Sequence, residues 1–453
     1  MKKKLVYFTS LFTTIILLGL SIFFNFTYSP FNADNVKNNI ALFSSETYEG
    51  RLPGTDGNLL VGEIIRQNFE SNNLTPLNGD YKESFKALCP VKKDSTPSIK
   101  ILSEDNVLEV LKYGTDYKED MINFRNSTLT FSNEDKINIY TNSFEVVTED
   151  GNCLFHVPKN NDFSFRSSFM SDFPYDMLIA ITTDTFNKIL DSIRNDLTIS
   201  VDIPFENSEK ELFNVVGVIE GTSEVLPPLV LTAHYDHLGK DGLNNTYKGA
   251  LDNASGTSFL LELQRTLSSF KKPKRDIIFV ALNAEEFGLL GSKNFAERNL
   301  EVLKDAEVIN FDMIGSEDYP LTLMLGVSYK DKESKLLDSI NKIAKDNKVE
   351  TDVVYEDSSD HASFNNAGID ALSFCHSDTR RIHTPEDTVE HISTDAINSA
   401  YSVVQDKIYD SCYSNLTVFF YTKSSIITFS TILVILLLIP FALKIREENK
   451  KIS

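Results

Sequence analysis

The hydrophobic residues of this chain gather into two long stretches near its ends and into shorter runs between them. Residues 5–26 carry no charge and follow lysines at positions 2–4, a layout typical of a signal peptide or an uncleaved signal anchor. The anchor is favoured because no A-x-A-like cleavage site follows. Residues 426–443 form a second uncharged stretch, which contains "ILVILLLIP" and precedes four basic residues. A buried core helix would also be apolar, but this length, terminal position and basic flank favour a membrane-spanning helix.

The basic residues at both ends indicate an orientation in the membrane. Lysine and arginine beside a membrane span favour the cytoplasmic side. Both termini are therefore expected in the cytoplasm and residues 32 to about 417 outside the cell, whether or not the first stretch is cleaved. We expect a cell-membrane protein whose main domain is extracellular.

Between the two ends, strand-like and helix-like patterns alternate after residue 205. The runs "PPLVLTAH" (227–234), "DIIFVAL" (276–282) and "VINFDMIG" (308–315) predict strands, and residues 255–270 and 331–346 predict amphipathic helices. This order predicts an α/β fold with a mixed, largely parallel central sheet flanked by helices. In such folds ligands bind beyond the carboxyl ends of the strands.

The first half of the chain has a different texture. Residues 32–88 open with a helix-like pattern and include "EGRLPGTDG", a loop rich in glycine and proline. Residues 89–205 contain short alternating runs such as "STLTF" and "LIAITT", which predict the strands of a small mixed α/β domain inserted into the main one. The expected organisation is 1–31 signal anchor or signal peptide, 32–88 first part of the main domain, 89–205 insert, 206–417 remainder of the main domain, 425–444 transmembrane helix and 445–453 cytoplasmic tail.

Composition narrows the classes of function. The 453 residues include 44 Lys plus Arg against 65 Asp plus Glu, a net charge of -21, so a nucleic-acid partner, which needs clustered cations, is not expected. The four cysteines, Cys89, Cys153, Cys375 and Cys412, would face an environment that permits disulfides. No CxxC pair occurs among them, so a cysteine zinc site is not expected, and their pairing stays open.

Residues that can bind a metal or move a proton recur at the boundaries of the predicted elements. They are His234 and Asp236 after the first strand, Asp252 before a helix, Glu285 and Glu286 after the second strand, Asp312 at the end of the third, and His383 in "RIHTPEDT". Each alone has an ordinary structural explanation; Asp252, for example, could cap the following helix. Their recurrence at five boundaries indicates a common site.

The adjacent carboxylates Glu285 and Glu286 pose the choice most sharply. A strand that runs out into a solvated loop would explain them. Alternatively, one carboxylate ligates a metal ion while its neighbour handles protons on a metal-bound water. Because neighbouring side chains of an extended chain point to opposite faces, a bend after Ala284 is needed to turn both toward a metal.

In this order, the H-x-D pair, "DNASG", the Glu pair, "NFDMIG" and "HTPEDT" resemble the co-catalytic di-zinc aminopeptidase family, which includes bacterial leucyl aminopeptidases and glutamate carboxypeptidase-like peptidases. The resemblance covers residues 213–392 densely, and "EGRLPGTDG" with "NNLTPLNGDYKESF" resembles the family's N-terminal part. Residues 89–205 resemble the protease-associated domain that many members carry as an insertion. The chain departs from the family at Ile382, where an aromatic residue commonly precedes the last histidine, and this leaves the orientation of His383 open.

The resemblance implies two Zn²⁺ ions per chain, held by five side chains. Asp252 would bridge both ions. His234 and Asp312 would complete one site, and Glu286 and His383 the other. Three protein ligands per ion, with a water between the ions, match the open coordination of catalytic zinc.

The resemblance also implies roles around the ions. Glu285 would be the general base, and Asp236 would accept the free N–H of His234 and fix its tautomer. Asp360 and His361, in "SSDHASF", match a stretch near the family's substrate cleft and are expected to bind substrate. His237 is expected to have a structural or supporting role.

The expected function is that of a membrane-anchored extracellular di-zinc metallopeptidase, a hydrolase that acts as an aminopeptidase on peptides. Carboxypeptidase action stays open, because Arg380 and Arg381 could bind the terminal carboxylate of a substrate, and so does glutaminyl cyclase-like activity. A non-catalytic, receptor-like ectodomain is the alternative outside the enzyme class, but it would have little need for Glu285 together with all five ligands. The sequence does not indicate an oligomeric state.

Overall fold

A mixed eight-stranded sheet forms the centre of the computed structural model, which describes residues 2–104 and 106–452. In spatial order its strands are β1 (Lys82–Lys92), β11 (Phe205–Ile219), β13 (Ile277–Leu282), β12 (Leu229–His234), β14 (Glu307–Phe311), β17 (Asp370–His376), β15 (Leu321–Leu325) and β16 (Thr351–Tyr355). The four central strands run parallel to one another. The predicted α/β fold with a mixed, largely parallel sheet is therefore confirmed, and the runs predicted as strands at 227–234, 276–282 and 308–315 are β12, β13 and β14.

Helices cover both faces of this sheet. One face packs against α2 (Ala33–Phe43), α3 (Asp56–Ser71), α5 (Gly256–Ser268), α7 (Lys335–Asp346) and α9 (Thr394–Cys412), and the other against α6 (Leu290–Arg298) and α8 (His361–Asn366). Strand β13 shows why an unbroken apolar run is needed, because Phe279 points into the first core while Ile278 and Val280 point into the second. The helices predicted at 255–270 and 331–346 are α5 and α7.

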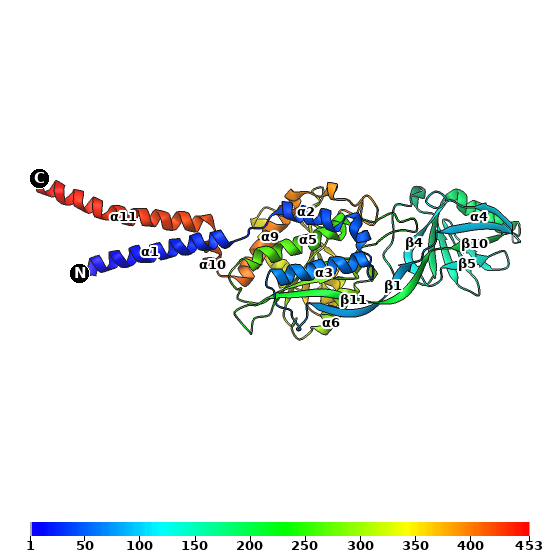
Figure 1. The fold of residues 1–453 in the computed structure, drawn as a ribbon, viewed down its shortest axis with the longest axis horizontal. Helices are drawn as coiled ribbons and strands as arrows, with labels where there is room; N and C mark the ends of the chain where they lie inside the picture. The colour runs from blue at the N-terminus through cyan, green and yellow to red at the C-terminus, as the bar shows by residue number, and fades with distance from the viewer. Residues whose placement is uncertain (1, 105, 453) are drawn as a thin grey trace.

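Residues 98–202 form two smaller sheets beyond one end of the main sheet (Figure 1). The first contains β3 (Asn106–Val110), β2 (Ser98–Ser103), β10 (Thr198–Asp202) and β5 (Thr128–Phe131). The second contains β4 (Tyr117–Phe124), β9 (Met177–Ile181), β8 (Asn152–His156), β7 (Ser143–Val147) and β6 (Lys136–Ile139), and helix α4 (Thr183–Arg194) follows β9. We call residues 93–204 the insert.

The insert is joined to the main sheet by two long antiparallel strands. β1 and β11 pair without interruption from Lys82 opposite Val215 to Lys92 opposite Phe205. The boundary expected between residues 88 and 89 therefore falls inside β1. The core of the insert also includes Leu238, Ala284 and Phe287 of the main domain, so the two parts pack against each other.

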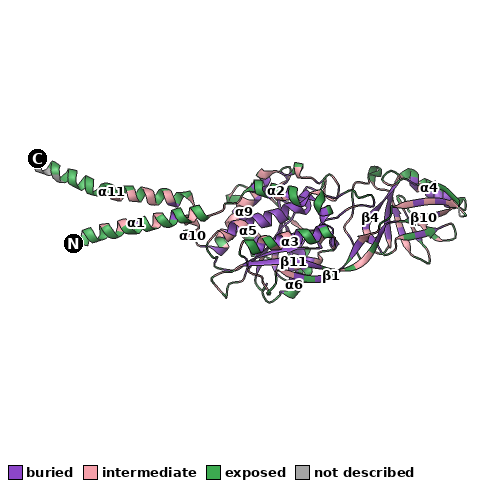
Figure 2. Ribbon diagram, in the orientation of Figure 1, coloured by how far each residue is buried: buried purple, intermediate pink, exposed green. Residues whose placement is uncertain are grey.

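Both termini are long helices that leave the main domain at the end opposite the insert (Figure 1). They are α1 (Lys2–Thr27) and α11 (Lys423–Ile452), with the short α10 (Asn415–Phe420) before α11. They lie side by side, and the Tyr7 hydroxyl donates a hydrogen bond of 3.2 Å to the Leu436 carbonyl. By length and composition, each is apolar enough to cross a membrane. Most of their surface is exposed (Figure 2), so α11 is not the buried core helix that its sequence alone would also have allowed.

All four cysteines are buried in the protein interior and have free thiols. Burial raises the pKa of the Cys89 thiol to about 12. The thiols therefore pack as small apolar groups.

Candidate metal centre

The residues predicted to share a site meet at the carboxyl ends of the central strands. β13, β12 and β14 are parallel neighbours, so the segments that follow them emerge at one edge of the sheet. His234 is the last residue of β12, Asp312 follows β14, and the two glutamates lie three and four residues beyond β13. Parallel pairing thus brings together side chains that are up to 78 residues apart in sequence.

Asp252 lies between two groups of side chains, one on each of its carboxylate oxygens. Its Oδ1 is 3.5 Å from His234 Nε2, which is also 3.4 Å from Asp312 Oδ1. Its Oδ2 is 3.2 Å from His383 Nε2, which is also 3.4 Å from Glu286 Oε2. The five residues thus form two sets of three that share Asp252.

These separations match the spacing of ligands around a zinc-sized ion. Ligand atoms bound to one zinc ion at about 2.0–2.1 Å in a tetrahedral arrangement lie about 3.3–3.4 Å apart. The four N···O separations of 3.2, 3.4, 3.4 and 3.5 Å fall around that value. The donor set, two imidazoles and three carboxylates, also suits zinc. The residues present therefore fit a pair of metal ions.

Two groups from outside the five residues hold Asp252 in place. The Asp387 carboxylate accepts the backbone N–H groups of Leu251 and Asp252 at 2.8 and 3.0 Å. Burial raises the pKa of Asp387 to about 7. The guanidinium of Arg51 is fully buried. It donates to the backbone carbonyls of Tyr235 at 3.0 Å and of Gly249, three residues before Asp252, at 2.7 Å. Arg51 lies in "EGRLPGTDG" and Asp387 in "HTPEDT". The sequence identifies both motifs, but it does not predict a role for either residue.

A left-handed residue, Ala284, lies directly before Glu285 and Glu286. Ala284 has a φ of 60°, and a single 3-10 turn over Glu285–Phe287 follows. The expected bend after Ala284 is therefore present. Potential ligand atoms of Glu285 lie within 4.8 Å of those of His234 and Asp312, while Glu286 forms a corresponding group with Asp252 and His237. Both carboxylates face the centre, one toward each set.

Asp236 holds this turn through the backbone. Its Oδ1 and Oδ2 each accept a backbone N–H at 3.1 Å, from Glu285 and Glu286 respectively. Its distance to His234 Nδ1 is 3.6 Å, which is longer than a hydrogen bond. The structure thus links Asp236 to the two glutamates more closely than to the histidine it was expected to orient.

The carboxylates gathered at this centre favour the binding of a cation among them. Burial raises the pKa of Glu285 well above its usual range, and Glu286 and Asp360 raise it further against the opposing effect of His234. Burial lowers the pKa of His234, but the carboxylates of Glu285 and Asp312 outweigh it and hold the pKa well above its usual value. In the metal-free protein these groups therefore retain protons that a bound cation would displace.

The remaining candidates differ in how far their polar atoms are already used. His237 Nδ1 lies 3.0 Å from Glu286 Oε1, and burial lowers its pKa to about 3, so a neutral ring donates to the carboxylate. His361 is buried and uses both ring nitrogens, on Ser373 Oγ and on the Glu356 carbonyl. Asp360 is also buried, and within the described part of the chain neither of its oxygens accepts a hydrogen bond. Burial raises its pKa to about 7.

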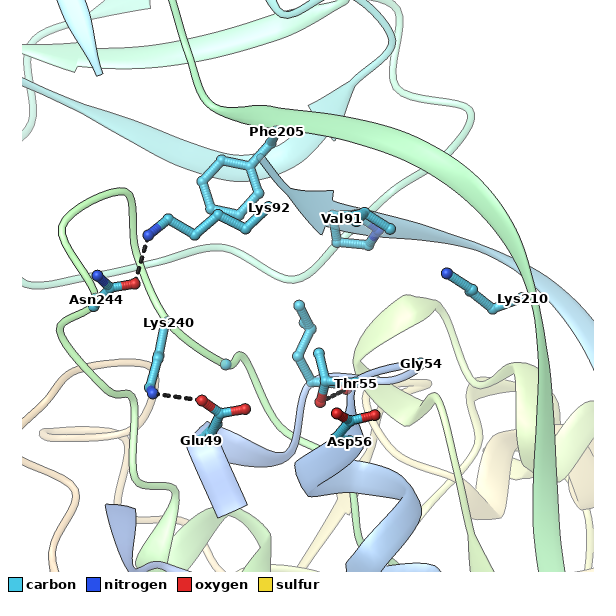
Figure 3. A pocket seen from close by; sticks show the side chains of 13 residues that line it. Glu49, Gly54, Thr55, Asp56, Val91, Lys92, Phe205, Lys210, Lys240 and Asn244 are labelled. Carbon is cyan, nitrogen blue, oxygen red and sulfur yellow. Dashed lines mark hydrogen bonds and ion pairs between the residues drawn. The ribbon is translucent and has the colours of Figure 1, made fainter. Parts of the chain in front are cut away.

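Two cavities lie near this region. One, of about 440 Å³, opens beside Asp312 and is lined by apolar side chains, including Met313, Met324, Val354 and Ile382, and by several serines. The other, of about 340 Å³, lies where β1 and β11 leave the main sheet and contains Lys92, Lys210 and Lys240 (Figure 3). No side chain of the two sets lines the second cavity, and two of its lysines are already engaged, with Asn244 and Glu49. The first cavity alone adjoins the centre.

Sequence comparison places residues 214–407 in a known group of proteins. These residues match peptidase family M28. Aminopeptidase YwaD of Bacillus subtilis (strain 168) is 36% identical over 212 residues, which are 44% of this chain and 44% of that protein. Aminopeptidase NAALADL1 of Rattus norvegicus is 38% identical over 107 residues, 22% of this chain and 13% of that protein. The chain thus spans less than half the length of these relatives.

Solved structures share the fold over a larger part of the chain. An aminopeptidase from Aneurinibacillus sp. strain AM-1 has a TM-score of 0.58 at 20% identity and covers 85% of this chain and 95% of its own. A zinc aminopeptidase from Bacillus subtilis has a TM-score of 0.58 at 19% identity, with 85% and 97% covered. At such identities the likeness concerns the fold, and the sequence match supplies the family. Residues 214–407 of the chain therefore match peptidase family M28.

Proposed function

We propose that this protein is a membrane-anchored, extracytoplasmic di-zinc exopeptidase that removes N-terminal residues from peptides. The observation that carries the proposal is the division of five ligand side chains, four of them buried, into two sets that share Asp252, with ligand-atom separations of zinc size. The match of residues 214–407 to family M28 and the aminopeptidases among the similar proteins support the reaction class. Hydrolysis of a peptide bond is the chemistry that such a centre serves.

When bound, two zinc ions would polarise the scissile carbonyl and lower the pKa of a water between them. Asp252, His234 and Asp312 would hold one ion, and Asp252, Glu286 and His383 the other. Glu285 acts as the proton carrier. It takes a proton from the attacking water and delivers it to the nitrogen of the leaving amine, so that the broken C–N bond ends in a free amino group.

Asp236 keeps the two glutamates in these separate roles. Because its carboxylate accepts the N–H groups of both residues, the turn after Ala284 cannot rotate without breaking two hydrogen bonds. Glu285 and Glu286 therefore present their carboxylates to the centre in a fixed relation. A general base that is held in place contributes typically about 10²–10⁴-fold to the rate.

The cavity beside Asp312 supports a preference for apolar side chains. Its methionine, valine and isoleucine side chains offer apolar surface to a substrate side chain placed next to the scissile bond, beside the hydroxyl groups of its serines. Burial and the fully buried Asp360 carboxyl both raise the pKa of Glu285. We therefore propose that Asp360 acts on the general base Glu285 and that the residues lining the cavity contact the substrate. His361 uses both ring nitrogens on Ser373 and Glu356, which line this cavity, and so would hold the cavity lining in place.

The alternatives can be weighed against specific contacts. A carboxypeptidase needs a free cation for the substrate's terminal carboxylate, but Arg380 is paired with Asp378 and Asp318. Among the described residues Arg381 forms no ion pair, so it is the cation that carboxypeptidase action would have to use. A receptor-like ectodomain would not require Glu285 together with all five ligand residues. Glutaminyl cyclase-like activity is distinguished from aminopeptidase activity by an assay on a peptide with N-terminal glutamine.

The test uses the full chain in detergent and a panel of fluorogenic peptides. The panel contains peptides with a free N-terminus, peptides with a blocked N-terminus and a free carboxylate, and a peptide with N-terminal glutamine. We expect release of apolar N-terminal residues, loss of activity with a chelator and recovery with zinc. Cleavage only from the carboxyl end, cyclisation without hydrolysis, or turnover that a chelator leaves intact would each overturn the proposal.

We also propose that α1 and α11 cross the cell membrane as a pair. Each has 24 residues in its apolar span, which at about 1.5 Å per residue exceeds the roughly 30 Å of bilayer hydrocarbon. The N-terminal end of α1 and the C-terminal end of α11 lie at the same far end of the pair (Figure 1), and the sequence places Lys2 and Lys4 in the first of these ends and Lys444 and Arg446 toward the second. This arrangement supports a cytoplasmic location for both termini and an extracellular location for the metal centre.

A further inference from the structure

An irregular segment of the insert lies against the metal centre. Residues 163–170, which we call the bridging segment, follow a short 3-10 turn after β8 and form neither helix nor strand. The segment belongs to the insert by sequence, yet four of its residues contact Glu286 or His383. The two residues contacted are those that the proposed function assigns, with Asp252, to one of the two ions.

The first contacts are to Glu286. The Ser168 hydroxyl donates a 2.6 Å hydrogen bond to Glu286 Oε2, the oxygen that faces His383. The Phe169 backbone N–H donates to the Glu286 carbonyl at 3.0 Å, and the Phe169 ring packs against Phe287 at 4.9 Å. His237 occupies the other oxygen, Oε1. Ser168 therefore limits the rotation of the carboxylate and leaves Oε2 one lone pair for a ligand bond.

The second contacts are to His383. Its Nδ1 lies 3.1 Å from the Arg166 carbonyl, and its own carbonyl accepts the Arg166 N–H at 2.9 Å. Because a carbonyl can only accept, the proton of the neutral ring sits on Nδ1, and Nε2 is left facing Asp252 and Glu286. His383 has a φ of 59°, an unfavourable conformation for this residue type that the paired hydrogen bonds stabilise.

The ring of Phe165 adds a third contact. It stacks on the His383 ring with centroids 5.5 Å apart and planes 22° apart, although the side chain is 55% exposed. The position before His383 is occupied by Ile382, so the aromatic neighbour of this histidine comes from the insert. Stacking restricts the imidazole to one orientation.

The bridging segment is itself held by residues of the insert and of the main domain. Ser167 donates through its N–H and its hydroxyl to Asp120 at 2.6 and 2.8 Å. The fully buried Arg166 guanidinium lies over the rings of Phe205 and Tyr247 at 5.5 and 5.4 Å. The position of the segment is therefore set by β4 and by the root of β11.

The other set of ligands is held without the insert. The Ser359 hydroxyl donates to Asp312 Oδ2 at 2.7 Å, and the Thr257 hydroxyl donates to the His234 carbonyl at 2.6 Å. Both partners belong to the main domain. Within the residues described, hydrogen bonds from the insert to the five candidate ligands reach Glu286 and His383 alone.

From this asymmetry we infer that the insert builds one of the two metal sites, with Ser168 and Phe165 as positioning residues for Glu286 and His383. The inference rests on the proposed di-zinc function and assigns the insert a part in it. The site of His234 and Asp312 depends on the main domain alone. Loss of the Ser168 hydroxyl should thus weaken the binding of one ion and leave the other tight.

The experiment measures zinc binding to the full chain in detergent by competition with a chromophoric chelator. The wild type is expected to bind two ions. Ser168→Ala should weaken one of them by roughly 10–100-fold, the usual effect of removing a hydrogen bond to a ligand, and Ser168→Thr should restore it. Phe165→Ala, which removes an exposed ring, should weaken the same ion by about 2–10-fold.

Ser167→Ala is the matched control. It removes a hydroxyl one position away that contacts Asp120 instead of the centre, and the backbone bond of Ser167 to Asp120 remains. Both ions should bind this variant as they bind the wild type. If the wild type binds two ions and Ser168→Ala binds both equally well, the inference is overturned while the proposed function stands. Weakening of both ions together, or an equal effect of Ser167→Ala, would also overturn it. A wild type that binds no zinc would instead overturn the proposed function.

Discussion

At the scale of single residues, the contrast between Glu285 and Glu286 carries most of the chemistry. Glu286 is buried, and its two oxygens accept hydrogen bonds from His237 and Ser168. Glu285 is half-buried, and among the described residues no hydrogen bond reaches its carboxylate. A carboxylate that is held on both oxygens suits a metal ligand, whereas one with free oxygens suits proton transfer.

This contrast predicts different failures for the two amide variants. Glu285→Gln should retain both zinc ions and lose about 10²–10⁴-fold in kcat, because the shape is kept and the proton carrier is removed. Glu286→Gln should lose affinity for one ion, because an uncharged amide is a poorer ligand. Activity assays with and without excess zinc check this: zinc should partly rescue Glu286→Gln only. A reversed rescue pattern would exchange the two roles, and full activity of both variants would contradict the site.

Zinc binding is also predicted to release protons. Burial lowers the pKa of His383, but the carboxylates of Glu286 and Asp252 outweigh it and raise the pKa to about 10. In the metal-free protein the ring is therefore protonated at neutral pH and must lose its proton to bind a metal. Zinc affinity should rise by up to about tenfold per pH unit for each proton released, between about pH 7 and 9.

Calorimetry checks this linkage. Titrations of zinc into the metal-free chain in two buffers of different ionisation enthalpy should give different heats, since the buffer takes up the released protons. Equal heats in both buffers, together with an affinity that does not change with pH, would contradict the raised pKa of the centre.

At the scale of elements, one arginine joins the end of α2 to two segments that lie 184 to 198 positions after it. The Arg51 guanidinium donates to the carbonyls of Phe43 at the end of α2, of Tyr235 after β12, and of Lys248 and Gly249 before Asp252. Burial lowers its pKa to about 10 although Asp387 and Asp252 lie near, so the side chain keeps its charge at neutral pH. The loop that presents Asp252 therefore depends on a residue about two hundred positions earlier.

Arg51→Met is predicted to lower the free energy of unfolding by more than about 3 kcal/mol, because buried carbonyls lose a charged donor. Arg51→Lys should recover little, since an ammonium cannot match the planar set of donors. Arg66, which forms ion pairs with Glu63 and Glu70 at the surface of α3, offers the comparison. Arg66→Met should change the stability by no more than about 1 kcal/mol. Denaturant titrations followed by circular dichroism measure all three, and equal losses at the two positions would contradict the assignment.

At the scale of the whole molecule, the candidate metal centre lies where the bridging segment of the insert meets the main domain. The terminal helices leave the main domain at the opposite end. If α1 and α11 span the bilayer, the centre faces away from the lipid surface. Peptides dissolved outside the cell would then reach it without contact with the membrane.

This arrangement predicts the result of proteolysis on intact cells that carry an epitope tag at each terminus. An added protease should cut the body between residues 32 and 417 and leave both tags protected until the membrane is permeabilised, because the proposed orientation puts both ends in the cytoplasm. Loss of the C-terminal tag in intact cells would place α11 in the opposite orientation. Protection of the whole body would place the main domain inside the cell.

The family match and the architecture follow from local patterns that the sequence shows directly. Unbroken apolar runs such as residues 277–282 form buried strands because both faces of a parallel sheet are covered, and the polar residue that ends each run must then lie at the edge of the sheet. For this reason His234, Glu286 and Asp312 could be assigned to one site before any contact was known. The need for a bend at Ala284 followed in the same way from the alternation of side chains along a strand.

The contacts that hold these residues were decided by the tertiary structure alone. Ser168 and Glu286 are 118 positions apart, and His383 and Arg166 are 217 apart. A serine in an irregular loop belongs to no periodic pattern. Its role depends on which other side chain the packing of the protein brings within about 3 Å of its hydroxyl. Asp236 illustrates the same limit, because the H-x-D spacing placed it beside His234 while the fold gave its carboxylate to the backbone of two glutamates. The sequence by itself determined which elements form and which residues end them, since these depend on neighbours along the chain; only the tertiary structure decided what orients each ligand, since that depends on neighbours in space.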